Sequence, residues 1–473
     1  MRIENIHFKN IGVFDDELIE FEPTGEENQA EIHIITGPNG SGKSTILYGL
    51  ASAFDPLSKG FELYSSNFFY KRFRYFTSEK KERNEVPQEK ISELYVDFAN
   101  REWVRVYGSK NSENIAHQIY PSKYDFDSPN VLSTYQKLNE SKIKNYHKTI
   151  WHKQKPIEEF DFAAFAYSGY RYVQGSKING VKEFNDNPLH QSLEFVKKWE
   201  QDSDDYNINQ WIANNISKRS ISKEKGDKNA HKKYAQTVSN LENILSQILE
   251  QSIEFDIGLD PLNLFIKTNN TLLDFDVLPD GMRSLISWIA DLMMRLDELK
   301  WVDDTPIFER RLFLFLDEIE VHLHPKWQRN VLPIVQKLFK NAQIFVTTHS
   351  PFVVNSVDNA WIHPIRLEGG KATMEKPFKS ESGFSYPYIL REVFGIEERF
   401  GKDAQTKLED FYEIRDEILR TANQKNYVNK LKKLDKVGNY LRKQSTELNT
   451  IVEGEIRQLN TIIENEILNE KVG

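Results

Sequence analysis

Gly37 to Thr45, which reads GPNGSGKST, is the stretch of sequence that decides the fold of this chain. It satisfies the pattern GxxxxGK[ST], in which small residues let backbone N–H groups curl around phosphates and the following helix offers its positive end. We expect Lys43 to reach the β- and γ-phosphates, and the Ser44 hydroxyl to bind magnesium, which keeps most of its waters. The expected ATP-binding residues are Gly37, Pro38, Asn39, Gly40, Ser41, Gly42, Lys43, Ser44 and Thr45.

The residues on both sides of this loop indicate a turn between a strand and a helix. The isoleucines of residues 32–35 form a short apolar strand, and the apolar residues of 46–51 keep helical spacing. A phosphate-binding loop requires this context, so a chance match in a Gly-rich turn is disfavoured.

A second motif lies downstream at Leu312–Leu316, five apolar residues followed by Asp317 and Glu318. Buried parallel strands have continuous apolar runs of this kind, and the pair at the end is typical of a Walker B strand. Asp317 is expected to hold magnesium through water, and Glu318 to orient and polarise the attacking water. A merely solvated acidic pair does not suit a position behind such a strand.

Two further features resemble the ABC-type class of P-loop ATPases. The first is a strand at 344–346 that leads through two threonines to His349. His349 resembles the switch histidine, which in that class contacts the γ-phosphate and the attacking water, a role that suits an imidazole at neutral pH. A lone histidine is usually structural, but this position, one helix after Asp317, favours a catalytic role.

The second feature is Leu278–Leu285, LPDGMRSL, which lies where an ABC signature is expected and resembles LSGGQ in part. Pro279 replaces the serine whose hydroxyl would meet the γ-phosphate, so we expect slow turnover and contacts from the helix N-terminus instead. In that class the signature of one subunit covers the nucleotide bound by another, which implies a dimer that sandwiches two ATP molecules. The residues expected to act on a partner's nucleotide are Asp280, Gly281, Met282, Arg283 and Ser284.

The loops between these motifs contain further candidate residues. Gln174 is the candidate Q-loop residue because it lies between the phosphate loop and the signature, and Arg171 is an alternative that could respond to nucleotide. Glu320, His322 and His324 occupy the D-loop position, between Asp317 and the next helix, and no third ligand cluster accompanies the two histidines, so we do not predict a metal site there. Pro325 is well placed to begin the next helix.

The pattern of the whole chain predicts an α/β fold, an ABC-type P-loop ATPase head with a mixed sheet and an N-terminal antiparallel β subdomain. A hairpin is expected from Ile3 to Phe21 and a second meander around residues 94–106. A helical pattern from Leu189 to Gln251 predicts a helical lid, and helical stripes after residue 400 predict a helical C-terminal tail. The expected domains are an N-terminal lobe (1–185), a lid insertion (186–255), a C-terminal lobe (256–395) and a tail for partner or self-association (396–473).

The composition is that of a folded protein, with 39% hydrophobic and 28% charged residues among 473. The absence of cysteine excludes disulfides, thiol nucleophiles and Cys-ligated metals. Neither a signal peptide nor a membrane-spanning apolar run is present in the sequence, so we expect a cytoplasmic protein without membrane contact.

The net charge of −9 means that nucleic acid could be bound only through a local basic patch. Charge runs of this kind most often form solvated faces, and nucleic-acid binding is the alternative. One candidate patch comprises Lys71, Arg72, Arg74, Lys80, Lys81 and Arg83, and the other comprises Lys218, Arg219, Lys223, Lys225, Lys228, Lys232 and Lys233.

The order of motifs, the N-terminal hairpin and the phrase DEIEVHLHP from Asp317 to Pro325 resemble the RecF, Rad50 and OLD branch of ABC ATPases. The segment Leu278 to Leu296, with a short lid and a helical tail, looks most like the PtuA ATPases of Septu and retron antiphage systems. That resemblance implies a homodimer or higher oligomer and a separate HNH nuclease, PtuB-like, which the ATPase restrains or licenses. A RecF-like DNA-repair ATPase without a nuclease partner is the alternative, and a transporter subunit fits least well.

The sequence of the C-terminal tail distinguishes between these classes of ATPase. Residues 452–455, VEGE, mimic the opening of the Toprim domain of OLD nucleases, but helical spacing runs through the 18 residues that follow Glu455. No histidine occurs after His363, which excludes an HNH site in the tail. We therefore expect no nuclease site in this chain.

Overall fold

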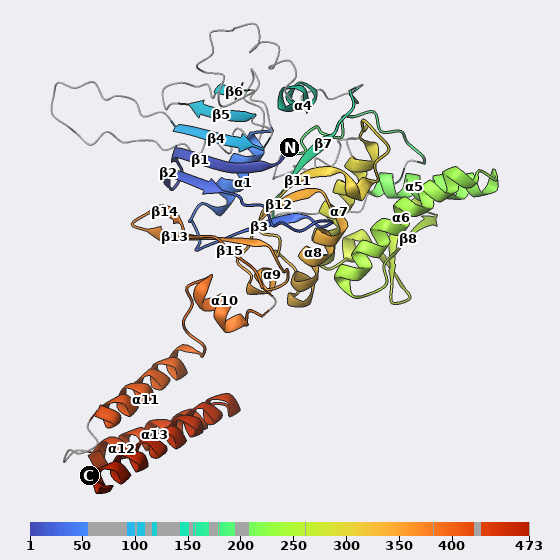
Figure 1. Cartoon of the computed structure of the whole chain (residues 1–473). Helices are drawn as coiled ribbons and strands as arrows, with labels where there is room; N and C mark the ends of the chain where they lie inside the picture. The colour runs from blue at the N-terminus through green and yellow to red at the C-terminus, as the bar shows by residue number, and fades with distance from the viewer. Residues whose placement is uncertain are drawn as a thin grey trace, which may run out of the picture. The chain divides into compact units, whose positions relative to one another are not determined.

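The computed structural model describes residues 1–54, 92–99, 102–108, 116–120, 142–150, 155–156, 158–169, 178, 180–193, 208–260, 262–381, 383–420 and 427–472. The chain divides into two compact units, Met1–Ile389 and Leu390–Gly473. The candidate site lies in the first unit, and the second is a bundle of helices (Figure 1).

A seven-stranded sheet forms the centre of the first unit, in the order β14-β13-β3-β12-β11-β7, with β15 paired to β13 (Figure 1). The strands from β13 to β7 run parallel, and β14 and β15 pair antiparallel with β13. Side chains of the inner strands are buried along nearly their whole length, as expected of a parallel sheet covered on both faces. The strands are β3 (Glu31–Thr36), β7 (Phe162–Tyr167), β11 (Arg311–Leu316), β12 (Ala342–Thr347), β13 (Trp361–Glu368), β14 (Lys371–Met374) and β15 (Phe378–Lys379).

Helices pack on this sheet through aromatic and aliphatic side chains. Phe54, just after α1 (Lys43–Ser52), lies with its ring centroid 4.8 Å from that of Phe313 on β11. Tyr146 of α4 (Lys142–Ile150) stacks on Phe162 of β7 with a ring-centroid distance of 4.8 Å. These aromatic contacts hold the strands and the helix that follows the phosphate loop in one core. Further helices of this unit are α7 (Asp280–Glu298), α8 (Pro325–Leu338), α9 (Pro351–Val354), η2 (Phe275–Val277) and η3 (Ile307–Glu309), and α10 (Tyr386–Glu392) spans the boundary between the units.

An antiparallel sheet contains the N-terminal hairpin, in the order β2-β1-β4-β5-β6. Four apolar residues of β1 are buried, Ile3, Ile6, Phe8 and Ile11, and φ is positive at Asn10 near the strand end and at Gly12 in the turn that follows. The predicted hairpin and the predicted N-terminal antiparallel subdomain are thus confirmed. The strands are β1 (Ile3–Ile11), β2 (Phe14–Glu20), β4 (Ser92–Phe98), β5 (Trp103–Gly108) and β6 (Ala116–Tyr120).

The lid region contains a helical hairpin, α5 (Ile208–Glu224) and α6 (Lys228–Leu249), whose helices pack against each other. The prediction of helix from Leu189 was wrong at its start, because residues 188–193 form turns. The side chain of Asn187 accepts a hydrogen bond of 3.0 Å from the Leu189 backbone N–H, which favours a turn over a helix. A small antiparallel sheet that we did not predict follows, with strands β8 (Glu254–Leu259), β9 (Leu262–Thr268) and β10 (Thr271–Asp274).

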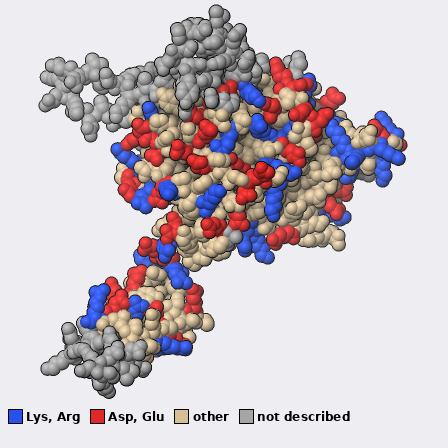
Figure 2. Space-filling view, viewed as in Figure 1, with Lys and Arg blue, Asp and Glu red and all other residues tan. Residues whose placement is uncertain are grey.

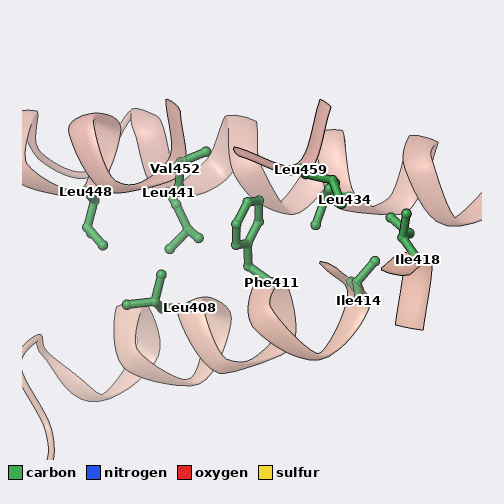
Figure 3. Close-up of a cluster of buried hydrophobic side chains, with 9 residues drawn as sticks. All are labelled: Leu408, Phe411, Ile414, Ile418, Leu434, Leu441, Leu448, Val452 and Leu459. Carbon is green, nitrogen blue, oxygen red and sulfur yellow. The ribbon is translucent and has the colours of Figure 1, made fainter. Parts of the chain in front are cut away.

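The second unit has a hydrophobic core of its own. Helices α11 (Lys402–Arg420), α12 (Tyr427–Arg442) and α13 (Thr446–Val472) surround a cluster in which Phe411 lies at the centre (Figure 3). Gly438 lets α12 approach this ring closely, because an added Cβ would lie 3.3 Å from it. The cluster comprises Leu408, Phe411, Ile414, Ile418, Leu434, Leu441, Leu448, Val452 and Leu459.

Helices long and apolar enough to cross a membrane are absent from the part of the chain that the structure describes.

Candidate nucleotide-binding site

The candidate site lies along the carboxyl edge of the parallel strands. The sheet order β3-β12-β11-β7 brings together four strand ends: the phosphate loop after β3, His349 after β12, Asp317 after β11 and Gly169 after β7. Carboxyl edges of open parallel sheets are the usual place for ligands, because loops and helix N-termini meet there. The topology thus gathers motifs that are far apart in sequence.

The phosphate loop has a backbone that its glycines make possible. Gly37, Gly40 and Gly42 have φ values of 151°, 78° and 94°. An added Cβ on Gly37 would lie 2.8 Å from the Ile365 carbonyl oxygen, and one on Gly42 would lie 2.7 Å from the Phe14 ring. Around the Cβ position of Gly40, in contrast, the described atoms leave at least 4 Å of open space. The loop is therefore packed at both ends and open in the middle, which fits a cradle for phosphates.

Lys43, the first residue of α1, is folded over this loop. Its Nζ donates hydrogen bonds of 3.0 Å to the Gly37 carbonyl and 2.9 Å to the Pro38 carbonyl. Burial lowers the pKa of Lys43 to about 8, while the charges of Asp317, Glu318 and Glu320 act in the opposite direction. The side chain thus stays mainly protonated at pH 7 and can bind phosphate oxygens.

Asp317 is the centre of a cluster of oxygen atoms. Its Oδ1 accepts hydrogen bonds from Ser44 Oγ at 3.0 Å and from Thr347 Oγ1 at 2.5 Å, and its Oδ2 accepts one from Tyr48 at 3.3 Å. Magnesium prefers oxygen ligands and needs few from the protein, so Ser44 and Asp317 fit a magnesium ion that accompanies a nucleotide. Sequence reasoning missed Thr347 and Tyr48, because hydroxyl residues in a strand end and a helix have no distinct signal.

Glu318 has a backbone conformation that is uncommon for a residue other than glycine, with φ of 47°. Its N–H donates to Thr347 Oγ1 at 2.8 Å, so one hydroxyl contacts both members of the acidic pair. An added Cβ on Gly169 would lie 3.1 Å from Glu318 Oε2, which puts this carboxylate beside the end of β7. Such backbone strain is typical of functional residues, whose side chains must point in one direction.

His349 is held through its backbone by a carboxylate that the sequence reasoning placed only in the D-loop. The His349 N–H donates to Glu320 Oε1 at 2.5 Å, and burial raises the pKa of Glu320. Burial also lowers the pKa of His349, with the charge of Lys43 acting in the same direction and that of Asp317 against it. The imidazole is therefore neutral at pH 7 and able to donate or accept a hydrogen bond.

The signature segment forms the first turns of α7, which begins at Asp280 after Pro279. Gly281 packs directly on the D-loop, because an added Cβ would lie 2.5 Å from the His322 carbonyl oxygen. Asp280 and Arg283 form an ion pair of 2.5 Å, and Asp280 is exposed. Ser284, which we expected to contact a partner's nucleotide, has a buried side chain with 2% exposure, as does Met282 with 3%. Asp280 and Arg283 are thus the side chains of this segment that reach the surface.

Three of the sequence predictions fall outside the described residues. These are the Q-loop candidate Gln174, its alternative Arg171, and the first basic patch between residues 71 and 83. Within the part of the chain that the structure covers, no group of three His, Asp or Glu side chains could hold a metal ion by itself.

Comparison with known proteins agrees with this geometry. The model of the family described as "AAA domain, putative AbiEii toxin, Type IV TA system" matches residues 32–355. The chain is similar to "Retron Ec83 probable ATPase" of Escherichia coli, at 25% identity over 86% of this chain and 79% of the relative. It is also similar to "Septu protein PtuA" of Bacillus thuringiensis, at 26% identity over 32% of this chain and 40% of the relative. The predicted resemblance to PtuA and retron ATPases is therefore confirmed.

Among solved structures, an "SmcHead bound to the C-winged helix domain of ScpA" is similar, at 15% identity over 80% of this chain and 98% of that chain, with a TM-score of 0.43.

Proposed function

The chain belongs to the AAA domain family that matches residues 32–355, and we propose that it hydrolyses ATP as the regulatory subunit of an antiphage defence complex. The observation that carries the ATPase part is the convergence of Lys43, Ser44 and Asp317 at one sheet edge, with Ser44 Oγ and Asp317 Oδ1 3.0 Å apart. The similarity to a retron ATPase and to PtuA of Septu supports the defence part.

Each residue of the site has a defined task in this proposal. The backbone of residues 37–45 and the Lys43 ammonium bind the phosphates, and Ser44 and Asp317 would hold magnesium. When bound, magnesium would neutralise charge on the β- and γ-phosphates. Glu318 accepts the proton of the attacking water and orients it, and the neutral imidazole of His349 binds near the γ-phosphate.

A second copy of the chain completes the site in this proposal. The first turn of α7 carries the side chains of Asp280 and Arg283 at the surface. At Gly281 the backbone of this turn packs closely against the D-loop. A helix N-terminus favours an anion, so α7 of one subunit can cover the γ-phosphate bound by another. Pro279 offers no hydroxyl to that phosphate, which suits a device that holds ATP for long periods and hydrolyses it slowly.

The effector of the complex is, in this proposal, a separate HNH nuclease similar to PtuB. The similarity to a Septu protein supports a role in a defence system, and the second unit, with a core of its own, is a suitable docking element for a partner. ATP-dependent dimerisation of the first unit would then control the nuclease. The alternative is a RecF-like ATPase that acts on DNA without a nuclease, which the same nucleotide site would serve equally well.

The experiment for the ATPase part is the variant Glu318→Gln. We expect it to bind ATP with unchanged affinity, because the phosphate contacts remain, and to lose hydrolysis by about 100-fold or more. Glu309→Gln, in the 3-10 helix before β11, where the side chain pairs with Lys340, is the matched control and should hydrolyse ATP normally. Equal turnover of Glu318→Gln and wild type would remove Glu318 from its catalytic role.

The experiment for the complex is purification of the tagged chain from its native host, followed by mass measurement. We expect one nuclease chain to co-purify, and its amount to change between ATP and ADP. Recovery of a homogeneous dimer without any nuclease would favour the RecF-like alternative.

A further inference from the structure

The helical hairpin of the lid ends in a cluster of positive charge, which we call the basic tip and define as residues 218–233. Within this range the acidic residues are Glu224 and Asp227, so seven cations and two anions give the tip a net charge of +5, in a chain of net charge −9. The seven cations of the basic tip are Lys218, Arg219, Lys223, Lys225, Lys228, Lys232 and Lys233.

The basic tip protrudes from the rest of the first unit. Every residue of α5 from Ile208 to Ile216 is buried, whereas nearly all residues from there to the end of the helix are not. In α6 the first buried residue is Val238, about 15 Å along the helix from Lys228. Figure 2 shows Lys and Arg gathered at the free end of the α5–α6 pair, which is light green in Figure 1. A large binding partner can therefore reach the tip from several sides.

The turn between the two helices is well ordered by its own contacts. Gly226 has φ of 71°, and the Asp227 side chain caps α6 by accepting from the Ala230 N–H at 3.0 Å. His231 Nδ1 lies 3.0 Å from the Arg219 carbonyl oxygen, which links α6 to α5. The cations are thus presented on a fixed scaffold, so little backbone entropy is lost when a partner binds.

The cations of the basic tip have no close acidic partners in the described part of the chain, although the charges of Lys218 and Lys233 act at longer range on Asp297 and that of Arg219 on Glu242. Among the described residues, none of the seven cations forms an ion pair within 4.0 Å, although lysines elsewhere do, as in Lys155–Glu298 at 2.6 Å. Lys218 lies 5.6 Å from the ring centroid of Tyr234, a contact that leaves its charge intact. A solvated face would normally mix both signs, whereas this tip has an excess of one sign.

We propose that the basic tip binds the sugar-phosphate backbone of double-stranded nucleic acid. Six of the seven cations are lysines, which act as point charges and lack the bidentate geometry with which arginine reads bases. Lys228 and Lys232 are one helical turn apart, about 6 Å along the helix axis, which is close to two of the roughly 3.4 Å phosphate spacings along one strand, so both can contact the same strand. Binding should therefore be independent of sequence and strongly dependent on salt. This proposal does not depend on the ATP site.

The test measures binding of a fluorescent 30-base-pair duplex to the full-length protein by anisotropy, at several salt concentrations between 50 and 200 mM. In the variant Lys225→Ala/Lys228→Ala/Lys232→Ala we expect at least about tenfold weaker binding at 0.1 M salt. The slope of log K against log salt should fall by about 2 to 3, because each lost phosphate contact removes about 0.9. A scrambled duplex should bind the wild type with the same affinity.

The matched control removes three exposed lysines from α12, as Lys432→Ala/Lys433→Ala/Lys436→Ala. It changes the net charge equally and should bind the duplex like wild type, and both variants should keep wild-type ATPase activity and melting temperature. Unchanged binding by the tip variant, or an equal loss in the control, would overturn the proposal. Tighter binding of fluorescent poly-glutamate than of the duplex would assign the tip to acidic proteins and would also overturn it.

Discussion

Ser44 and Asp317, which are 273 positions apart in the chain, are joined by a hydrogen bond of 3.0 Å between Oγ and Oδ1. Ser44 follows the glycine loop after β3, and Asp317 directly follows β11, with β12 between these strands. Thr347, at the end of β12, also donates to Oδ1, at 2.5 Å. Three neighbouring strands thus converge on one carboxylate oxygen.

This convergence predicts that Asp317→Asn abolishes turnover but not folding. The amide keeps an oxygen for Ser44 and Thr347, yet it loses the negative charge that would hold magnesium. We expect a decrease in ATPase rate of about 100-fold and a higher magnesium requirement, measured as rate against magnesium concentration. Tyr48→Phe, which removes the 3.3 Å bond to Oδ2 and leaves the carboxylate charge in place, should stay within about threefold of wild type. A normal magnesium curve for Asp317→Asn would contradict this role.

Glu320 is predicted to act as a hydrogen-bond acceptor and not through its charge. Its Oε1 accepts the His349 N–H at 2.5 Å, and burial raises its pKa. Glu320→Gln keeps an acceptor oxygen and should retain ATPase activity within about threefold, whereas Glu320→Ala leaves the N–H unpaired and should lose about 10- to 100-fold. If Glu320→Gln were as inactive as Glu318→Gln, the charge of Glu320 would be required.

The lowered pKa of Lys43, about 8, predicts a pH-dependent affinity for ATP. As the pH rises through 8, the free protein loses the Lys43 proton, which must be regained to bind phosphate. The dissociation constant measured by calorimetry should therefore rise above pH 8, by up to about tenfold per pH unit. In the Lys43→Arg variant the arginine stays charged at these pH values. The affinity of this variant for ATP need not equal that of wild type at pH 7, but it should not change between pH 8 and about 9.5. A parallel slope in both proteins would place the titration on the nucleotide or another residue.

The contact between Gly281 and the D-loop predicts that Gly281→Ala destabilises the first unit. The added Cβ would lie 2.5 Å from the His322 carbonyl oxygen, a backbone atom that cannot move alone. We expect a decrease of about 1 to 3 kcal/mol in the free energy of unfolding, measured by tryptophan fluorescence in urea. All 8 tryptophans lie in the first unit, so the signal reports that unit. Gly454→Ala in the second unit, with open space around the added Cβ, should leave this transition unchanged.

The sequence was most informative where backbone chemistry limits the choice of residue. Few folds other than a P-loop ATPase combine the glycine spacing of residues 37–42 with an apolar run that ends in Asp317, so the sequence sufficed to predict the sheet edge with both motifs. The N-terminal hairpin and the helices of the second unit follow in the same way from their periodicity.

Contacts between distant segments could not be predicted in this way. His33 and His363, for example, are 3.0 Å apart in the core although 330 positions separate them. The pairing of Glu320 with the His349 N–H likewise depends on the parallel register of β11 and β12. The sheet β8–β10 was missed although apolar residues alternate with polar ones along β8 and at the start of β9, and the start of the lid was wrong because an Asn187 side-chain bond outweighs helical spacing.

The ion pair between Asp280 and Arg283 at the start of α7 predicts opposite effects of two substitutions on ATP-driven dimerisation. If this helix covers the γ-phosphate of a second copy, the exposed Asp280 carboxylate repels the phosphate and the Arg283 guanidinium attracts it. In the Glu318→Gln background with ATP, we expect Asp280→Asn to tighten the dimer and Arg283→Gln to weaken it, each by about two- to fivefold. Analytical ultracentrifugation measures both dissociation constants, with Asp435→Asn on α12 as the control for a lost charge. Dimer affinity that is unchanged in both variants would show that α7 of one copy does not approach the nucleotide of the other.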